Sequence, residues 1–146
     1  MRLAIASDHG GYELKEQLRQ CLERDGHAVV DHGPRSGDAV DYPDYASLVA
    51  QAVVSGDAEA GVLVCGSGIG MSIAANKVDG IRAAVVQDVE HARLAAEHND
   101  ANVLCLGGRF TAPALAHDMV KAWLTAECQG DRHRRRVAKI ADLERR

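Results

Sequence analysis

Short apolar runs along the chain alternate with segments in which apolar residues recur every three or four positions. The runs, rich in Ala, Val, Leu and Ile, predict buried strands at residues 3–7, 28–31, 62–64, 83–86 and 103–106. The other segments have helical spacing and predict helices around residues 14–22, 42–53, 69–75, 89–97 and 112–125. Strands that alternate with helices form parallel sheets. The pattern therefore predicts one α/β domain over residues 1–146, a three-layer α/β/α sandwich with a five-stranded, mostly parallel, Rossmann-like sheet whose strand order stays open.

A further helix is predicted at about residues 132–144, beyond the fifth strand–helix unit. Its apolar stripe of Val137, Ile140 and Leu143 has little core of its own to join, so we expect it to pack on a partner subunit or across the domain. The arginine run at its start has two interpretations. It is a solvated helix start, or Arg132 and Arg136, four positions apart and so on one helical face, hold one phosphate between them.

Composition narrows the classes of function. Of the 146 residues, 47% are hydrophobic but only 3% are aromatic, which fits an α/β core of small aliphatic side chains. The net charge is −4, and no aromatic platform or second basic face accompanies the arginine run, so a nucleic-acid partner is not expected. No apolar run approaches the length of a membrane span and no signal peptide precedes the first strand. We therefore expect a cytoplasmic protein with no membrane partner.

The cysteines add a second constraint on the class. Cys21, Cys65, Cys105 and Cys128 are widely scattered, without a C-x-x-C pair or the spacing of a zinc site. This distribution predicts free thiols in a reducing compartment, no disulfide and no metal site.

The glycine-rich stretch after the third predicted strand is the most informative part of the chain. Cys65 follows that strand, and Gly66, Gly68 and Gly70 then allow a sharp turn into a helix that begins near Ile69. Backbone N–H groups at such a helix start bind phosphate or an enolate-like oxygen, and the same field favours a thiolate at Cys65. The simpler alternative is an ordinary strand-to-helix turn with Cys65 as a buried thiol.

A dinucleotide fingerprint is the nearest competing interpretation of this stretch. Gly66, Gly68 and the later acidic residue Asp88 fit part of it, but Met71 stands where the third glycine belongs. The strand is also the third of the chain rather than the first. Both facts disfavour NAD or FAD, and we expect no cofactor.

Polar residues of other loops complete the candidate site. Asp8 and His9 follow the first strand, and His98 and Asn99 end the fourth helix. We expect them to meet Cys65 at the carboxyl edge of the sheet, where open α/β sheets bind ligands. Taken alone, Asp8 could equally be the N-cap of a helix, and His9 could be a solvated loop residue. Together these groups suit acid–base chemistry on a phosphorylated metabolite, while a Cys/His pair alone would also suit a thiol hydrolase.

Several motifs in the same order resemble the ribose-5-phosphate isomerase B family, and some are shared with the related galactose-6-phosphate isomerase subunits. The resemblance extends from the first strand to the Arg132–Arg136 segment. The motifs are residues 8–11 (DHGG), 41–46 (DYPDYA), 65–70 (CGSGIG), 73–77 (IAANK), 80–83 (GIRA) and 98–104 (HNDANVL).

The resemblance implies reversible conversion of D-ribose 5-phosphate into D-ribulose 5-phosphate through a cis-enediolate, without metal or organic cofactor. Cys65 is then the base that moves a proton between C2 and C1, and Ser67 with the backbone N–H groups of the loop stabilises the enediolate. Asp8 and His98 serve ring opening. The loop that binds substrate consists of Gly66, Ser67, Gly68, Ile69 and Gly70.

The family also implies how the rest of the substrate is held. His9, Arg132 and Arg136 bind the phosphate, Asn99 contacts sugar hydroxyls, and Arg109 is a further candidate for the same pocket. Family members bind substrate at a dimer interface. We therefore expect a homodimer or a dimer of dimers, in which His98, Asn99 and the arginines act in cis or serve a partner's Cys65.

Two positions separate subgroups of the family. Part of the family has a glutamate base where this chain has Met71, so Cys65 indicates the cysteine-base subgroup. Ser67 stands where threonine is also common and keeps the hydroxyl. A hexose phosphate such as allose 6-phosphate or galactose 6-phosphate remains an alternative substrate, and a non-catalytic phosphosugar-binding module an alternative function.

Overall fold

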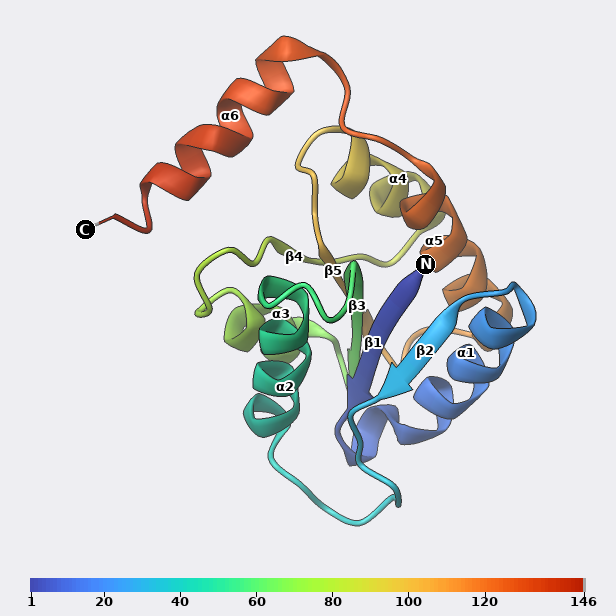
Figure 1. The fold of residues 1–146 in the computed structure, drawn as a ribbon. Coiled ribbons are helices and arrows are strands. Elements are labelled where there is room, and N and C mark those ends of the chain that lie inside the picture. Colours follow the sequence, from blue (N-terminus) through green and yellow to red (C-terminus); the bar gives the residue numbers. More distant parts are fainter. Residues whose placement is uncertain (146) are drawn as a thin grey trace.

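The computed structural model describes residues 1–145, and within them the chain builds one five-stranded, fully parallel sheet (Figure 1). The order β2-β1-β3-β5-β4 places three almost wholly buried strands inside and two partly exposed ones at the edges. The predicted α/β fold is thereby confirmed. The strands are β1 (Arg2–Ser7), β2 (Ala28–Asp31), β3 (Ala60–Cys65), β4 (Ala83–Val85) and β5 (Val103–Gly107).

Helices cover both faces of the sheet because successive side chains of each inner strand point to opposite sides. On β1, Leu3 and Ile5 join the apolar cluster under α1, α4 and α5, whereas Ala4 and Ala6 join the cluster under α2 and α3. The bounds are α1 (Tyr12–Arg24), preceded by a short 3-10 helix (His9–Gly11), α2 (Tyr42–Val54), α3 (Ile69–Ala75), α4 (Val89–Glu97), α5 (Pro113–Thr125) and α6 (Gly130–Asp142).

Two details of the predicted helices are corrected. The helical spacing of Leu115, Met119 and Trp123 would place all three on one buried face of α5, but Leu115 is 36% exposed, while Met119 and Trp123 are buried. Within the first turn of α5, Ala116 is the buried residue. The C-terminal helix begins at Gly130 and ends at Asp142, about two residues earlier than expected at each end.

Helix α6 projects away from the sheet rather than packing along it (Figure 1). Its apolar residues Ile140 and Leu143, at the end of the helix and just beyond it, are 41% and 59% exposed, and His133 is the residue of the helix that becomes buried. Among residues 1–145 no helix has both the length and the apolar character needed to cross a membrane.

The strand order creates a switch point between β1 and β3. From β1 the chain moves to its neighbour on one side, β2, whereas β3 and the later strands lie on the other side. Ligands of open α/β sheets bind outside the carboxyl ends of the strands at such a point. The loops after β1 and β3, which carry Asp8, His9 and the 66–70 glycines, therefore flank the expected ligand position.

Candidate active site

Three loops meet at the carboxyl edge of the sheet, and glycines allow their close approach. A Cβ added at Gly10 would lie 3.2 Å from the backbone nitrogen of Gly66, and one at Gly108 would lie 2.7 Å from the carbonyl oxygen of Gly10. Such distances leave little or no room for a side chain. The segments after β1, β3 and β5 thus form one continuous floor, which joins the DHGG motif to the Cys65 loop.

Cys65 is the last residue of β3 and is 5% exposed. The N–H of Gly68 donates a hydrogen bond to its Sγ at 3.1 Å, and α3 begins at the following residue. Gly68 has a φ of 82°, a left-handed conformation that suits glycine, so the turn that aims this N–H at the sulfur requires a residue without a side chain.

Cys105 shares the apolar cluster of Cys65 but differs from it in environment. Burial raises the pKa of the Cys105 thiol, and the neighbouring Cys65 adds to the rise. The side chain lies within β5 and is fully buried, so it remains a protonated core residue. Of these two neighbouring thiols, only Cys65 stands at the edge of the sheet.

The remaining loop residues present polar groups at the start of α3. Ser67 Oγ accepts a hydrogen bond from the N–H of Ile69 at 3.2 Å. Gly70 packs directly against the ring of Tyr42, since a Cβ there would lie 2.6 Å from a ring carbon. We did not single out Tyr42 from the sequence, where its sole signal is its place in the 41–46 motif.

Asp8, His9 and Arg109 lie around the same floor. Asp8 is 9% exposed and its Oδ1 accepts a hydrogen bond from the N–H of Gly11 at 3.1 Å, so the N-cap interpretation of this residue is confirmed. The N–H of Val40 donates to His9 Nδ1 at 3.2 Å. The Arg109 guanidinium covers Gly66, with its Cζ 3.2 Å from the position of a Cβ there.

His98 and Asn99 do not join this group, contrary to the sequence-based expectation. They follow α4, which leads back to the amino end of β5, and the nearby Asn102 carbonyl accepts a hydrogen bond from Gly61 at the start of β3. In a parallel βα unit the helix returns the chain to the amino edge of the sheet. The six-residue strand β3 therefore separates His98 from Cys65 by roughly 20 Å.

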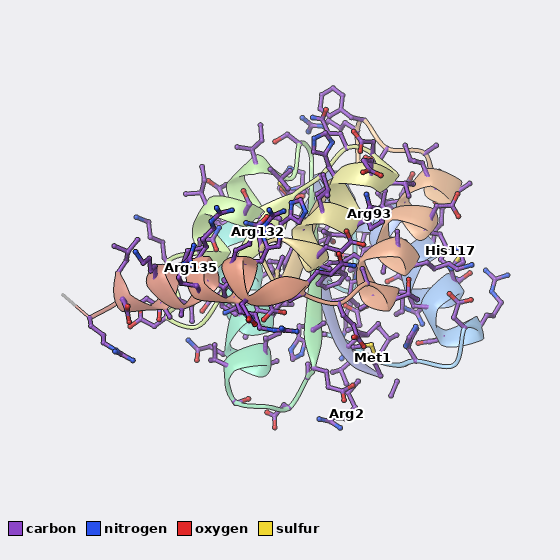
Figure 2. All side chains as sticks on the ribbon, turned by 90° about the horizontal axis from the view of Figure 1, so that it is seen from above. Met1, Arg2, Arg93, His117, Arg132 and Arg135 are labelled. Carbon is purple, nitrogen blue, oxygen red and sulfur yellow. The ribbon has the colours of Figure 1, made fainter. Side chains whose placement is uncertain are left out.

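Arg132 and Arg136 lie with His98 at this opposite edge. The His98 and His133 rings stack with their centroids 4.2 Å apart and their planes at 11°. Arg132 Nε donates to His133 Nε2 at 3.5 Å. Burial lowers the pKa of His133, and the nearby His98, Arg132 and Arg136 lower it further. Figure 2, viewed from above relative to Figure 1, shows Arg132 and Arg135 on α6 where this helix crosses the molecule.

The chain thus carries two groups of candidate site residues on opposite edges of its sheet. The carboxyl-edge group has a thiol, a carboxylate, an imidazole and a glycine loop. The amino-edge group has an imidazole, an amide and two arginines. Within residues 1–145, no three His, Cys, Asp or Glu side chains are placed to hold a common metal ion.

Fold and site together define a doubly wound α/β protein with acid–base and anion-binding groups. The comparison with protein families specifies this class further: the model of the family described as Ribose/Galactose Isomerase matches residues 3–140. The chain belongs to this family.

Individual relatives agree with the family along the whole chain. Ribose-5-phosphate isomerase B of Escherichia coli is 45% identical over 145 residues, 99% of this chain and 97% of its own length. The structure of ribose-5-phosphate isomerase B from Clostridium thermocellum is 50% identical with a TM-score of 0.98, covering 99% of this chain and 98% of that one. The Mycoplasma genitalium enzyme, solved with bound ribulose-5-phosphate, is 44% identical with a TM-score of 0.94, covering 99% and 96%.

Proposed function

We propose that this chain is an aldose–ketose isomerase that interconverts D-ribose 5-phosphate and D-ribulose 5-phosphate. The observation that carries the proposal is the thiol of Cys65, which lies at the end of β3 and accepts a hydrogen bond from the glycine loop that precedes α3. The chain that holds it is 45% identical, over 99% of its length, to ribose-5-phosphate isomerase B of Escherichia coli. A bound ribulose-5-phosphate in a relative of 44% identity supports the same substrate.

The chemistry assigned to the carboxyl edge is a proton transfer. The Cys65 thiolate takes the proton from C2 of the open-chain aldose, and the C1 carbonyl oxygen takes up the charge of the resulting cis-enediolate. The Ser67 hydroxyl and the N–H groups of the 66–70 loop that do not donate to Cys65 Sγ or Ser67 Oγ are assigned to stabilise this developing charge. The proton of the C2 hydroxyl moves to O1, and return of the Cys65 proton to C1 then gives the ketose. Both electrons stay in the substrate, so the reaction needs no redox cofactor.

Ring opening and phosphate binding use the remaining groups. Asp8 and His98 move the protons that open the furanose, with His98 as the donor to the ring oxygen. His9, Arg132 and Arg136 hold the phosphate, and Arg109, stacked over Gly66, extends the same positive lining. Asn99, which is exposed and lies two residues beyond the end of α4, contacts the sugar hydroxyls.

These roles require two copies of the chain, because one copy separates Cys65 from His98 by roughly the length of β3. In a homodimer the amino-edge group of one subunit completes the carboxyl-edge group of the other. Apolar surface supports this arrangement: Ile69 and Ile73 on α3, beside the loop, are 54% and 59% exposed. A cleft of about 520 Å³ beneath α6, lined in part by Ile140, offers a matching surface. A dimer of dimers would preserve the same shared sites.

The proposed cellular compartment follows from the free thiols, and the proposed metabolic role follows from the substrate. We place the enzyme in the cytoplasm and in pentose phosphate metabolism, as one isomerase domain over residues 1–146. All four cysteines are free, which suits a reducing compartment.

Ketose formation from ribose 5-phosphate tests the proposal. Purified protein with a chelator present is expected to convert ribose 5-phosphate with a kcat/KM at least roughly tenfold above that for allose 6-phosphate or galactose 6-phosphate, because a pocket sized for five carbons rejects a longer chain by about 1–3 kcal/mol. Turnover of a hexose phosphate alone would assign the hexose reaction instead. Binding of all three without turnover would leave a phosphosugar-binding module.

A further inference from the structure

Lys15, near the start of α1, is a buried cation that the proposed reaction does not use. Its side chain is 0% exposed, and no other lysine or arginine is buried among residues 1–145. Burying an ammonium group is unfavourable unless every donor finds a partner. Such pairs add little net stability compared with apolar side chains of the same volume, so a reason other than core stability is needed.

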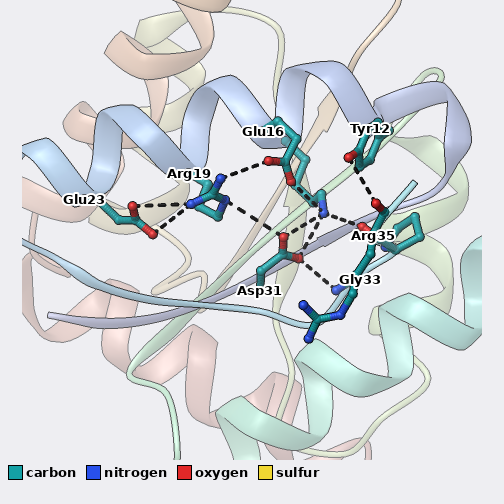
Figure 3. A network of polar contacts seen from close by, with 9 residues as sticks. Tyr12, Glu16, Arg19, Glu23, Asp31, Gly33 and Arg35 are labelled. Carbon is teal, nitrogen blue, oxygen red and sulfur yellow. Dashed lines mark hydrogen bonds and ion pairs between the residues drawn. The ribbon is translucent and has the colours of Figure 1, made fainter. Parts of the chain in front are cut away.

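Besides Glu16 of α1, the polar partners of Lys15 lie at the end of β2 and in the segment that follows it. Figure 3 labels Glu16, Asp31 and Gly33 of this network. The Lys15 Nζ donates to Asp31 Oδ1 and Oδ2 at 3.0 and 2.8 Å and to the Pro34 carbonyl at 2.7 Å. The Glu16 carboxylate lies 3.2 Å away. Asp31 Oδ1 in turn accepts from the Gly33 N–H at 2.8 Å. Lys15 thus joins helix α1 to the beginning of the loop formed by residues 32–41.

Further contacts hold the same loop against residues 7–12, which include the DHGG segment. The Tyr12 hydroxyl donates to the Arg35 carbonyl at 3.2 Å, and the Ser7 N–H donates to the Gly33 carbonyl at 3.0 Å. At the far end of the loop, the Val40 N–H donates to His9 Nδ1 at 3.2 Å. Because Nδ1 accepts this bond, a neutral His9 carries its proton on Nε2, as a donor for an oxyanion.

We propose that Lys15 is a positioning residue for His9: its bonds to Asp31 and Pro34 hold the 32–41 loop so that the Val40 N–H fixes the ring and tautomer of His9. Lys15 also lies one turn beyond the short helix that contains His9, so it ties together both segments that determine the position of this ring. The inference rests on the phosphate role that the proposed function gives to His9.

The test replaces Lys15 with methionine, which keeps the unbranched chain and removes the ammonium group. We expect the KM for ribose 5-phosphate and the Kd for inorganic phosphate, measured by calorimetry, to rise about tenfold, with kcat within about twofold, since a ground-state contact is lost. Leu18→Ala, at a fully buried position on the same helix, is the matched control. It should lower the melting temperature without changing KM or the phosphate Kd.

A double-mutant cycle with His9→Ala locates the effect. If Lys15 acts through His9, Lys15→Met adds no further loss of phosphate affinity in the His9→Ala protein. Independent, multiplying losses, or an unchanged phosphate Kd in Lys15→Met, would overturn the inference. An unchanged Kd in His9→Ala would remove His9 from the phosphate site and overturn the inference with it. Phosphate binding without any isomerase turnover would contradict the proposed function only.

A second pair of variants keeps the test decisive if Lys15→Met does not fold. Val40→Pro removes the N–H that His9 accepts, on a partly exposed loop, and Val40→Ala keeps it. The proline variant should raise the phosphate Kd about tenfold, because a misplaced His9 loses its hydrogen bond to the charged phosphate. The alanine variant should leave this Kd unchanged. Equal Kd values in the two variants would overturn the inference.

Discussion

Replacing Cys65 with alanine is expected to lower kcat for ribose 5-phosphate by roughly 10³-fold, within the usual range for a general base, while KM stays within about threefold. The phosphate and sugar contacts are assigned to other residues, so substrate still binds. Steady-state rates of ribulose 5-phosphate formation measure both constants. A kcat that stayed within tenfold of the unmodified protein would remove Cys65 from the proton transfer.

Two further cysteine variants separate chemistry from packing. Cys65→Ser keeps the shape of the side chain, but a hydroxyl is scarcely ionised near neutral pH, so we expect nearly the same loss of kcat as for alanine. Cys105→Ala removes a thiol from the same apolar cluster, but burial keeps that thiol protonated. It should lower the melting temperature and leave kcat within about threefold. Full activity in Cys65→Ser would show that the sulfur serves packing only.

Gly68→Ala is expected to lower both stability and activity. The residue has a φ of 82°, and an added Cβ would lie 2.9 Å from the Leu106 carbonyl carbon. The left-handed conformation costs about 1–2 kcal/mol for alanine, and overpacking against rigid backbone adds about 1–3 kcal/mol. We expect the free energy of unfolding to fall by about 2–5 kcal/mol. Displacement of the Gly68 N–H from Cys65 Sγ should lower kcat about 10²-fold, since small misplacements at a reacting group have effects of that size.

Gly56→Ala is the control for this variant. Gly56 has nearly the same φ, 85°, but no atom within 4 Å of the added Cβ, and it lies at the end of α2, away from the site. Its substitution should reduce the free energy of unfolding by about 1–2 kcal/mol and leave kcat unchanged. Chemical denaturation and steady-state kinetics measure the two effects. Equal losses of stability in both variants would contradict the close packing of Gly68 against β5.

The strand–helix pattern was sufficient to predict the fold class, because the buried inner strands are continuous apolar runs and each helix has an apolar face. It could not give the strand order. Val62 of β3 and Leu104 of β5 lie side by side in the order β2-β1-β3-β5-β4. Both residues are apolar, and the sequence around them does not indicate which strands become neighbours. Lys15 was missed for a related reason: a lysine between apolar positions of a helix is usually solvated, and its burial depends on Asp31, sixteen residues away.

The sequence could predict the position of those candidate site residues that lie at or directly after the end of a strand. Asp8 comes immediately after β1 and Cys65 is the last residue of β3, so parallel strands bring them to one edge of the sheet. His98 comes instead just after a helix, and within a single chain it does not join them; action on a partner's Cys65, the alternative that the sequence left open, stays a prediction. Because β4 and β5 are parallel, helix α4 between them returns the chain to the amino edge of the sheet, and His98 lies there. The role proposed for His98 therefore requires a partner subunit.

Mixing two inactive variants tests the shared site most directly. Cys65→Ala and His98→Ala proteins, each essentially inactive alone, are co-expressed with different tags, and the heterodimer carrying both tags is isolated. One of its two sites then combines Cys65 of one chain with His98 of the other, so the account predicts about half of the activity of the unmodified dimer. A heterodimer as inactive as its parents would contradict the account, because Cys65 and His98 acting within one chain would leave each of the two sites without one of these groups.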